Sequence, residues 1–142
     1  MKYVDASAIL RVIFGEAGQQ VPLDGGGLVT SQLVEVETFR AIDRERLLGR
    51  LDDATTGAKR KELSDFLTML DLIPIDRHVI ERARSSFAVN VRALDAIHVA
   101  TAEILSMEAS PEEVVFWTHD QRQATAALSR GLTVLGVERV AE

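Results

Sequence analysis

Short runs rich in β-branched and aromatic residues alternate along the chain with longer stretches whose apolar residues recur about every 3.6 positions. We expect strands at residues 2–5, 28–30, 72–75, 114–118 and 132–135. We expect helices at residues 7–14, 31–50, 58–70, 76–87, 93–107 and 121–129. This order of elements is typical of an α/β domain with a mostly parallel sheet.

Composition narrows the class of protein further. The length of 142 residues predicts one domain that spans residues 1–142. The absence of cysteine excludes a disulfide framework, a thiolate metal site and a cysteine nucleophile. No run reaches the roughly 18 apolar residues that span a membrane, and Asp5 and Arg11 interrupt the apolar run at the amino terminus. We therefore expect a cytoplasmic protein that does not interact with membranes.

The net charge of −6 argues against a protein that binds nucleic acid by neutralising many phosphates. It does not exclude a nuclease. Acids gathered at a metal site add to the negative count, and a bound cation reverses the sign of the local charge.

Two acids lie at the carboxyl ends of predicted strands. Asp5 ends the first strand, and Asp120 comes after the strand at 114–118. In open parallel sheets, ligands bind at the carboxyl ends of the strands. Aspartate is also a favoured N-cap, because its side chain accepts the free N–H groups of a helix start. For each residue taken alone, helix capping is the stronger interpretation.

Two further acids are harder to explain as caps. Glu37 lies about two turns into its predicted helix, and Asp95 is embedded in the nearly apolar helix at 93–107. A carboxylate inside an apolar helix needs a partner or a cation, because burial of an unpaired charge is costly. Glu35 points to the opposite side of the helix from Glu37, so only one of the two can serve the same site.

Four segments, in an order that spans nearly the whole chain, carry a resemblance to a known family. They are Val4-Asp5-Ala6-Ser7, Thr30-Ser31-Gln32-Leu33 followed by Glu37 and Arg40, the run LDAIHVATA at 94–102, and WTHDQR at 117–122 followed by Ala126-Ala127 and Gly131-Leu132. Together these segments resemble the PIN-domain nucleases, and specifically the VapC-type toxins of toxin–antitoxin modules. The family spacing selects Glu37 over Glu35. The long Gly-rich loop, Gln32 and His119 depart from the common pattern, but all four acids are present.

The resemblance implies a three-layer α/β/α domain with a mainly parallel sheet of four to five strands. It also implies metal-dependent hydrolysis of RNA phosphodiester bonds, with Asp5, Glu37, Asp95 and Asp120 as the catalytic residues. Asp5 and Asp95 are then the primary metal ligands, and Asp120 and Glu37 complete or orient the shell. Oxygen ligands suit Mg²⁺, which Mn²⁺ can replace. One ion or two are both compatible with this chemistry.

Lesser candidates have two interpretations each. The hydroxyls of Ser7 and Thr118 either contact a metal-bound water or phosphate, or act as caps. Arg40 and Arg92 either bind RNA phosphates or pair with neighbouring helix acids, and the same holds for Arg44 and Arg122. His98, one turn from Asp95, is either a structural histidine or part of the site.

Other side chains receive structural interpretations. We expect His78 and His119 to be solvated and Trp117 to lie in the core.

A toxin of this class implies partners. The resemblance implies a small VapB-type antitoxin whose tail occupies the active-site groove, and a homodimer of this chain. Apolar residues of the predicted helices between 31 and 70 either supply the dimer interface or pack in the core: Phe39, Leu47, Leu48 and Phe66.

Other functions fit less well. A haloacid-dehalogenase phosphatase needs a second Asp two residues after Asp5, where Ser7 stands. A receiver domain needs paired acids near the first strand and a Lys after a late strand, and the chain has neither. The non-enzymatic alternative is a PIN-like module that binds RNA or protein without cutting, and the intact set of four acids argues against it.

Overall fold

Five parallel strands form the central sheet of the computed structural model, which describes residues 1–110 and 112–137. Their spatial order is β3-β2-β1-β4-β5, and each neighbouring pair is parallel. The bounds are β1 Lys2–Val4, β2 Leu28–Ser31, β3 Asp71–Ile73, β4 Val115–Trp117 and β5 Thr133–Leu135. The α/β class and the five predicted strands are confirmed. The expected domain end at residue 142 lies outside the described residues.

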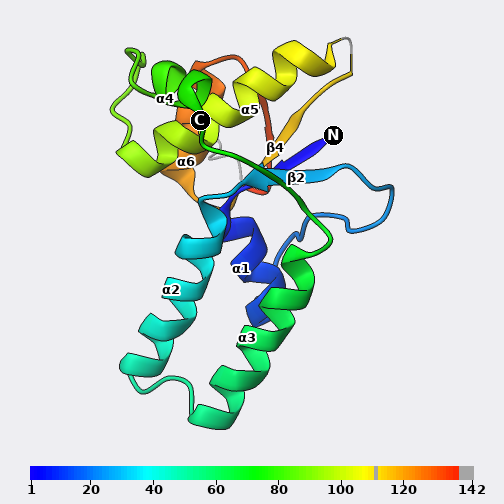
Figure 1. Cartoon of the computed structure of the whole chain (residues 1–142), viewed down its shortest axis with the longest axis vertical. Coiled ribbons are helices and arrows are strands. Elements are labelled where there is room, and N and C mark those ends of the chain that lie inside the picture. Colours follow the sequence, from blue (N-terminus) through cyan, green and yellow to red (C-terminus); the bar gives the residue numbers. More distant parts are fainter. Residues whose placement is uncertain (111, 138–142) are drawn as a thin grey trace.

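Helices cover both faces of this sheet. Their bounds are α1 Ala6–Phe14, α2 Val34–Leu47, α3 Asp53–Leu67, α4 Arg77–Ala83, α5 Ala93–Ala109 and α6 Gln121–Ser129. Helices α1, α2 and α3 lie on one side of the strands, and α4, α5 and α6 lie on the other (Figure 1). The three-layer α/β/α arrangement implied by the family resemblance is therefore confirmed.

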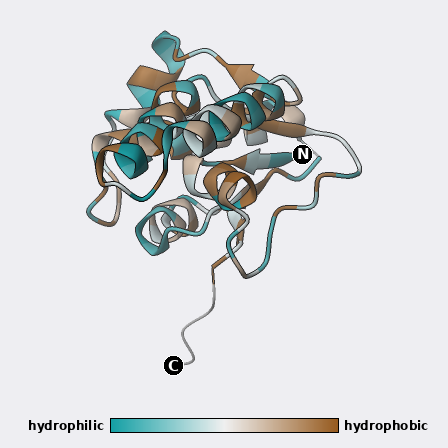
Figure 2. Cartoon of the chain, turned by 90° about the horizontal axis from the view of Figure 1, so that it is seen from below, coloured by the Kyte–Doolittle hydropathy of each residue, from teal (hydrophilic) through white to brown (hydrophobic). Residues whose placement is uncertain are grey.

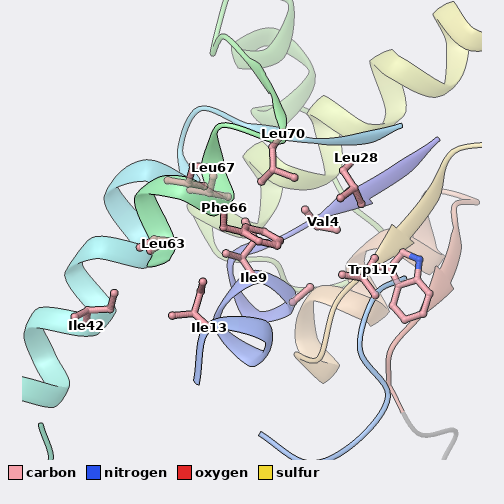
Figure 3. Close-up of a cluster of buried hydrophobic side chains, with 13 residues drawn as sticks. Val4, Ile9, Ile13, Leu28, Ile42, Leu63, Phe66, Leu67, Leu70 and Trp117 are labelled. Atoms are coloured by element: carbon pink, nitrogen blue, oxygen red, sulfur yellow. The ribbon is translucent and has the colours of Figure 1, made fainter. Parts of the chain in front are cut away.

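The two faces of the sheet carry separate cores because successive side chains of a strand point to opposite sides. On β1, Val4 packs with Ile9, Ile13 and the helices α1 to α3, whereas Tyr3 packs against Phe116 and the helices α5 and α6. The side chains of the core that contains Val4 point toward one another between the sheet and the helices α1 to α3 (Figure 3). The perpendicular view shows that the outer helices carry both hydrophobic and hydrophilic residues (Figure 2).

Helix boundaries differ from the prediction where capping and sheet pairing decide them. Helix α2 begins at Val34 rather than at residue 31, because Ser31 still pairs with Ile73 in the sheet. Helix α3 begins at Asp53 rather than at residue 58, because the side chain of Asp52 accepts a 2.7 Å hydrogen bond from the N–H of Thr55. Helix α4 ends at Ala83 rather than near residue 87.

The apolar residues proposed for an interface divide into two groups. Phe66 is buried in the core, so the core alternative holds for it, and Phe39 is half-buried against the same core. Leu47 and Leu48, at the end of α2, are 82% and 58% exposed. Between residues 1 and 137, Pro111 excepted, no helix has both the length and the apolar character needed to cross a membrane.

Candidate active site

Asp5 stands at the end of β1 and is almost fully buried, with 4% of its surface exposed. Its Oδ1 accepts hydrogen bonds from Ser7 Oγ at 2.6 Å and from the N–H of Ala8 at 3.0 Å, which caps α1. Its Oδ2 accepts a bond from Thr118 Oγ1 at 2.5 Å. Burial raises the pKa of Asp5 against the lowering effect of His98 and of these three hydrogen bonds. The carboxylate is thus both an N-cap and a rigidly held, desolvated acid.

The hydroxyls of Ser7 and Thr118 join the ends of β1 and β4. They lie 3.2 Å apart, and each donates to Asp5. Ser7 Oγ accepts from the N–H of His119 at 2.9 Å, and Thr118 Oγ1 accepts from the N–H of Asp120 at 3.0 Å. Because Thr118 is fully buried, its hydroxyl faces these groups instead of solvent. The two hydroxyls set the position of Asp5 relative to Asp120.

Asp120 is exposed at the start of α6. Its Oδ1 accepts hydrogen bonds from the N–H groups of Arg122 at 2.9 Å and Gln123 at 3.4 Å. The capping interpretation of Asp120 is therefore correct, as it is for Asp5. Capping occupies only one oxygen of Asp120, so it does not prevent the other oxygen from binding a ligand.

Glu37 and Asp95 both lie in the first turn of their helices, which for Glu37 corrects the prediction that it lies about two turns inside its helix. For Glu37, the cause is the late start of α2. Asp95 is half-buried, so its helix is less enclosed at this end than the apolar sequence suggested. A helix N-terminus favours negative charge, because the free N–H groups there carry partial positive charge. Both acids therefore interact favourably with a helix N-terminus, although for Asp95 burial and the neighbouring acids outweigh this and raise its pKa.

The electrostatics of Asp95 show that the four acids share one neighbourhood. Its pKa is raised by burial first and then by the negative charge of Asp120, while Asp5 and Glu37 raise it further and His98 lowers it. Repulsion of this kind acts only between carboxylates that lie near one another. The carboxyl edge of the sheet therefore gathers Asp5, Glu37, Asp95 and Asp120.

These carboxylates do not form a closed cage. Across residues 1–110 and 112–137, no three acidic or imidazole side chains are arranged so that they could hold a metal ion as they stand. Mg²⁺ seldom requires such a cage, since it keeps several waters and often binds one or two carboxylates together with substrate phosphates. The donors at this edge are all oxygen atoms, which fits Mg²⁺ or Mn²⁺ and disfavours softer metals.

A pocket of about 280 Å³ opens beside Asp95 and is lined by Asn90, Val91, Arg92, Asp95 and Arg122. Both arginines are exposed, and neither guanidinium has a hydrogen-bond or ion-pair partner in the part of the chain that the structure describes. Two unpaired cations next to an acid cluster form a place for an anion. Arg92 and Arg122, both candidates for phosphate binding in the sequence, thus line one pocket beside Asp95.

Arg40 lies elsewhere. It lines a separate pocket of about 170 Å³ along α2, with Asp43, Arg44 and Leu47. Among the described residues, Arg40 therefore does not share the pocket of Arg92.

Other polar groups of α5 have structural partners. Glu103 is buried and bridges Arg82 and Arg130, each with a 2.6 Å bond, which ties α5 to α4 and to the end of α6. His119 is partly buried and its Nδ1 lies 2.6 Å from the carbonyl oxygen of Gly136, so the prediction that it is solvated is wrong. His78 is exposed and Trp117 is buried, as predicted.

Glu37 is linked to two buried side chains. Its Oε1 lies 2.6 Å from Nε2 of His98, whose Nδ1 lies 2.6 Å from the hydroxyl of Tyr3. Glu35, by contrast, is exposed. The sequence did not predict a role for Tyr3 at the site, because Tyr3 lies in a buried strand. The available signal was that a buried tyrosine requires a hydrogen-bond partner for its hydroxyl.

The fold and the acid cluster define an α/β/α protein with a carboxylate-lined edge, and comparison with known proteins identifies its family. The PIN domain family model matches residues 2–128. Ribonuclease VapC46 of Mycobacterium tuberculosis is 30% identical over 137 residues, which cover 94% of this chain and 95% of that protein. The chain belongs to the PIN domain family, and the resemblance seen in its motifs is confirmed.

Two solved structures share the fold. A toxin–antitoxin complex from Klebsiella pneumoniae superimposes with a TM-score of 0.60 at 16% identity, covering 95% of this chain and 96% of that chain. PAE2754 from Pyrobaculum aerophilum gives a TM-score of 0.61 at 21% identity, covering 94% of this chain and 87% of that chain. At such identities the similarity concerns the fold alone.

Proposed function

We propose that this protein is a metal-dependent endoribonuclease and the toxin of a toxin–antitoxin module. The observation that carries the proposal is the gathering of Asp5, Glu37, Asp95 and Asp120 at the carboxyl edge of a parallel sheet. The near-full-length similarity to a protein named as a VapC ribonuclease supports RNA as the substrate.

In this proposal, Asp5, Asp95 and Asp120 hold Mg²⁺, with Mn²⁺ as a substitute. The ion, when bound, supplies a lower pKa for a water ligand and neutralises charge on the scissile phosphate. Ser7 and Thr118 orient the carboxylate of Asp5 through their hydrogen bonds. Glu37 keeps one oxygen without a partner among the described residues, and this oxygen is available to orient a water.

The pocket beside Asp95 binds an RNA phosphate in this scheme. Arg92 and Arg122 supply the two guanidinium groups, which match the geometry of phosphate oxygens. Both arginines border the acid cluster, so the phosphate they hold lies close to the bond that is cut. Arg40, farther along α2, contacts RNA only if the strand extends beyond this pocket.

Cleavage of RNA by the purified protein tests the proposal. We expect cleavage with Mg²⁺ or Mn²⁺ and none with EDTA. Asp5→Asn should abolish cleavage while the circular dichroism spectrum stays that of the wild type, because Asn retains the capping ability of Asp. RNA binding in EDTA with no cleavage under any metal condition would instead support a binding module without nuclease activity.

The remaining parts of the proposal concern partners and location. We propose a single cytoplasmic domain that pairs with a VapB-type antitoxin and forms a homodimer. The exposed Leu47 and Leu48 at the end of α2 support an interface there, because exposed leucines that lie together favour contact with another protein surface. Light scattering after size exclusion should give a molar mass of twice the chain mass of 15.6 kDa. The Leu47→Ser variant should give a molar mass closer to that of the monomer.

A further inference from the structure

Tyr3, His98 and Glu37 form a continuous chain of two short hydrogen bonds. The hydroxyl of Tyr3 lies 2.6 Å from Nδ1 of His98, and Nε2 of His98 lies 2.6 Å from Oε1 of Glu37. The three residues come from β1, α5 and α2, so the chain crosses the layers of the fold. Tyr3 is 0% and His98 is 2% exposed, whereas the side chain of Glu37 is 20% exposed. These hydrogen bonds thus connect the core to the acid cluster.

The direction of these bonds follows from the chemistry of the carboxylate. An ionised carboxylate only accepts hydrogen bonds, so Nε2–H of His98 donates to Oε1 of Glu37. A neutral imidazole that carries its proton on Nε2 accepts at Nδ1, where the O–H of Tyr3 can donate.

Packing holds the donor end of the chain in place. The ring of Tyr3 stacks on Phe116 with centroids 5.0 Å apart and meets His98 edge-on at 5.8 Å. The position of Glu37 Oε1 is therefore set by the central strand of the sheet, although Glu37 itself lies on α2. Among the described residues, Oε2 of Glu37 has no hydrogen-bond partner.

We propose that Tyr3 and His98 are positioning residues that fix one carboxylate oxygen of Glu37 and leave its other oxygen free for the reaction. The proposal rests on the nuclease function proposed above for the same acids. The plain alternative is a buried histidine that only stabilises the core. The two differ in what loss of the Tyr3 hydroxyl does to catalysis, because a purely structural pair changes stability and leaves kcat unchanged.

Kinetics separate the two roles. Removal of a group that orients a site carboxylate lowers activity by about 10-fold to 100-fold. We expect Tyr3→Phe to lower kcat at the low end of that range with KM within about twofold, and His98→Gln, which keeps an N–H donor, to retain more activity than His98→Leu. Thr101→Val is the matched control: it removes a buried hydroxyl from α5 that bonds only to the carbonyl of Ile97, and it should leave kcat unchanged.

A double-mutant comparison links the effect to Glu37. In a Glu37→Gln background, Tyr3→Phe should cause no further loss of kcat, because the carboxylate that it positions is already gone. A Tyr3→Phe variant that melts at lower temperature but keeps wild-type kcat would overturn the proposal. So would equal losses of kcat in the wild-type and Glu37→Gln backgrounds.

Nitrogen NMR of the metal-free protein tests the hydrogen-bond chain without any cleavage assay. We expect a proton on Nε2 of His98, with the Nδ1 resonance shifting on Tyr3→Phe and the Nε2 resonance shifting on Glu37→Gln. This result would stand even if no RNA were cut, which separates failure of the nuclease proposal from failure of the positioning proposal. An Nδ1–H tautomer, or a His98 spectrum that neither variant changes, would contradict the positioning role.

Discussion

Two aspartates of the candidate site, Asp5 and Asp120, cap helices and still have acceptor capacity to spare. Asp5 caps α1 through Oδ1 and is held by Thr118 through Oδ2, and capping does not use all of its acceptor capacity. Asp120 caps α6 in the same way. A cap at the carboxyl edge of a parallel sheet is therefore no argument against a catalytic role, because capping leaves lone pairs of the carboxylate available to a ligand.

The crowding of acids has a cost that substitution can reveal. The pKa of Asp95 is raised above its ordinary value of 3.8, so stability falls as the pH rises from that value through the raised pKa, and the ionised carboxylate destabilises the fold at neutral pH. We expect Asp95→Asn to stabilise the metal-free protein at neutral pH. The gain should stay below about 1 kcal/mol, because Asp95 is half exposed and solvent screens the repulsion.

Thermal unfolding in EDTA measures this gain. The difference between Asp95→Asn and the wild type should disappear when the pH falls below the ordinary range of aspartate, since both proteins are then neutral at this position. Asp71→Asn, at an exposed position of β3, is the control and should change little. A variant less stable than the wild type at neutral pH would contradict the electrostatic account.

The sequence predicts single residues well only where local position decides their place. Asp5 and Asp120 could be placed at the sheet edge because each lies at the carboxyl end of a strand. The contact of Tyr3 with His98 could not be predicted, because it joins residues 95 positions apart in the chain. It depends on which face of β1 meets α5, and hydrophobic pattern alone does not determine that packing.

At the scale of elements, the order of strands and helices could be predicted and the helix starts could not. The order follows from the spacing of hydrophobic residues, which can be seen within each segment without knowledge of the rest of the fold. The start of α2 depends instead on Ser31 pairing with Ile73 of another strand, and the start of α3 depends on the side chain of Asp52. The misplaced start of α2 made Glu37 seem buried inside its helix, so an error of a few residues changed the expected environment of a candidate catalytic acid.

Helix α6 allows capping to be separated from catalysis. Asp120→Asn should keep the bonds to the N–H groups of Arg122 and Gln123 and hence the stability, because Asn caps about as well as Asp. Asp120→Ala should lower the free energy of unfolding, measured with urea, by about 1 kcal/mol. Both variants should lose RNA cleavage to a similar extent if the charge of Asp120 serves the metal. Full cleavage by Asp120→Asn would show that Asp120 is a cap alone.

For the whole molecule, the net charge contrasts with the charge of the candidate site. The chain carries a net charge of −6, yet the pocket at the acid cluster presents two arginines without partners among the described residues. Under the proposed function, RNA that binds in this pocket would contact few phosphates. Binding would then depend on local geometry and a bound cation more than on a broad positive surface.

Salt dependence of RNA binding measures the number of phosphates contacted. For single-stranded RNA in EDTA, two contacts predict a slope of log K against log salt of about −1.4, at about −0.7 for each phosphate. Arg92→Ala and Arg122→Ala should each reduce the slope by about half, whereas Arg77→Ala, on the surface of α4 beside Glu81, should not. A steep wild-type slope that neither pocket variant reduces would place the RNA on another surface.

Binding of Mn²⁺, followed by electron paramagnetic resonance, tests whether the four acids form a metal site. We expect the wild type to bind the ion, Asp5→Asn and Asp95→Asn to bind it at least tenfold more weakly, as expected when a ligand is lost, and Asp71→Asn to bind it as the wild type does. Unchanged Mn²⁺ affinity in both Asp5→Asn and Asp95→Asn would contradict the assignment of a metal site to the carboxyl edge of this sheet.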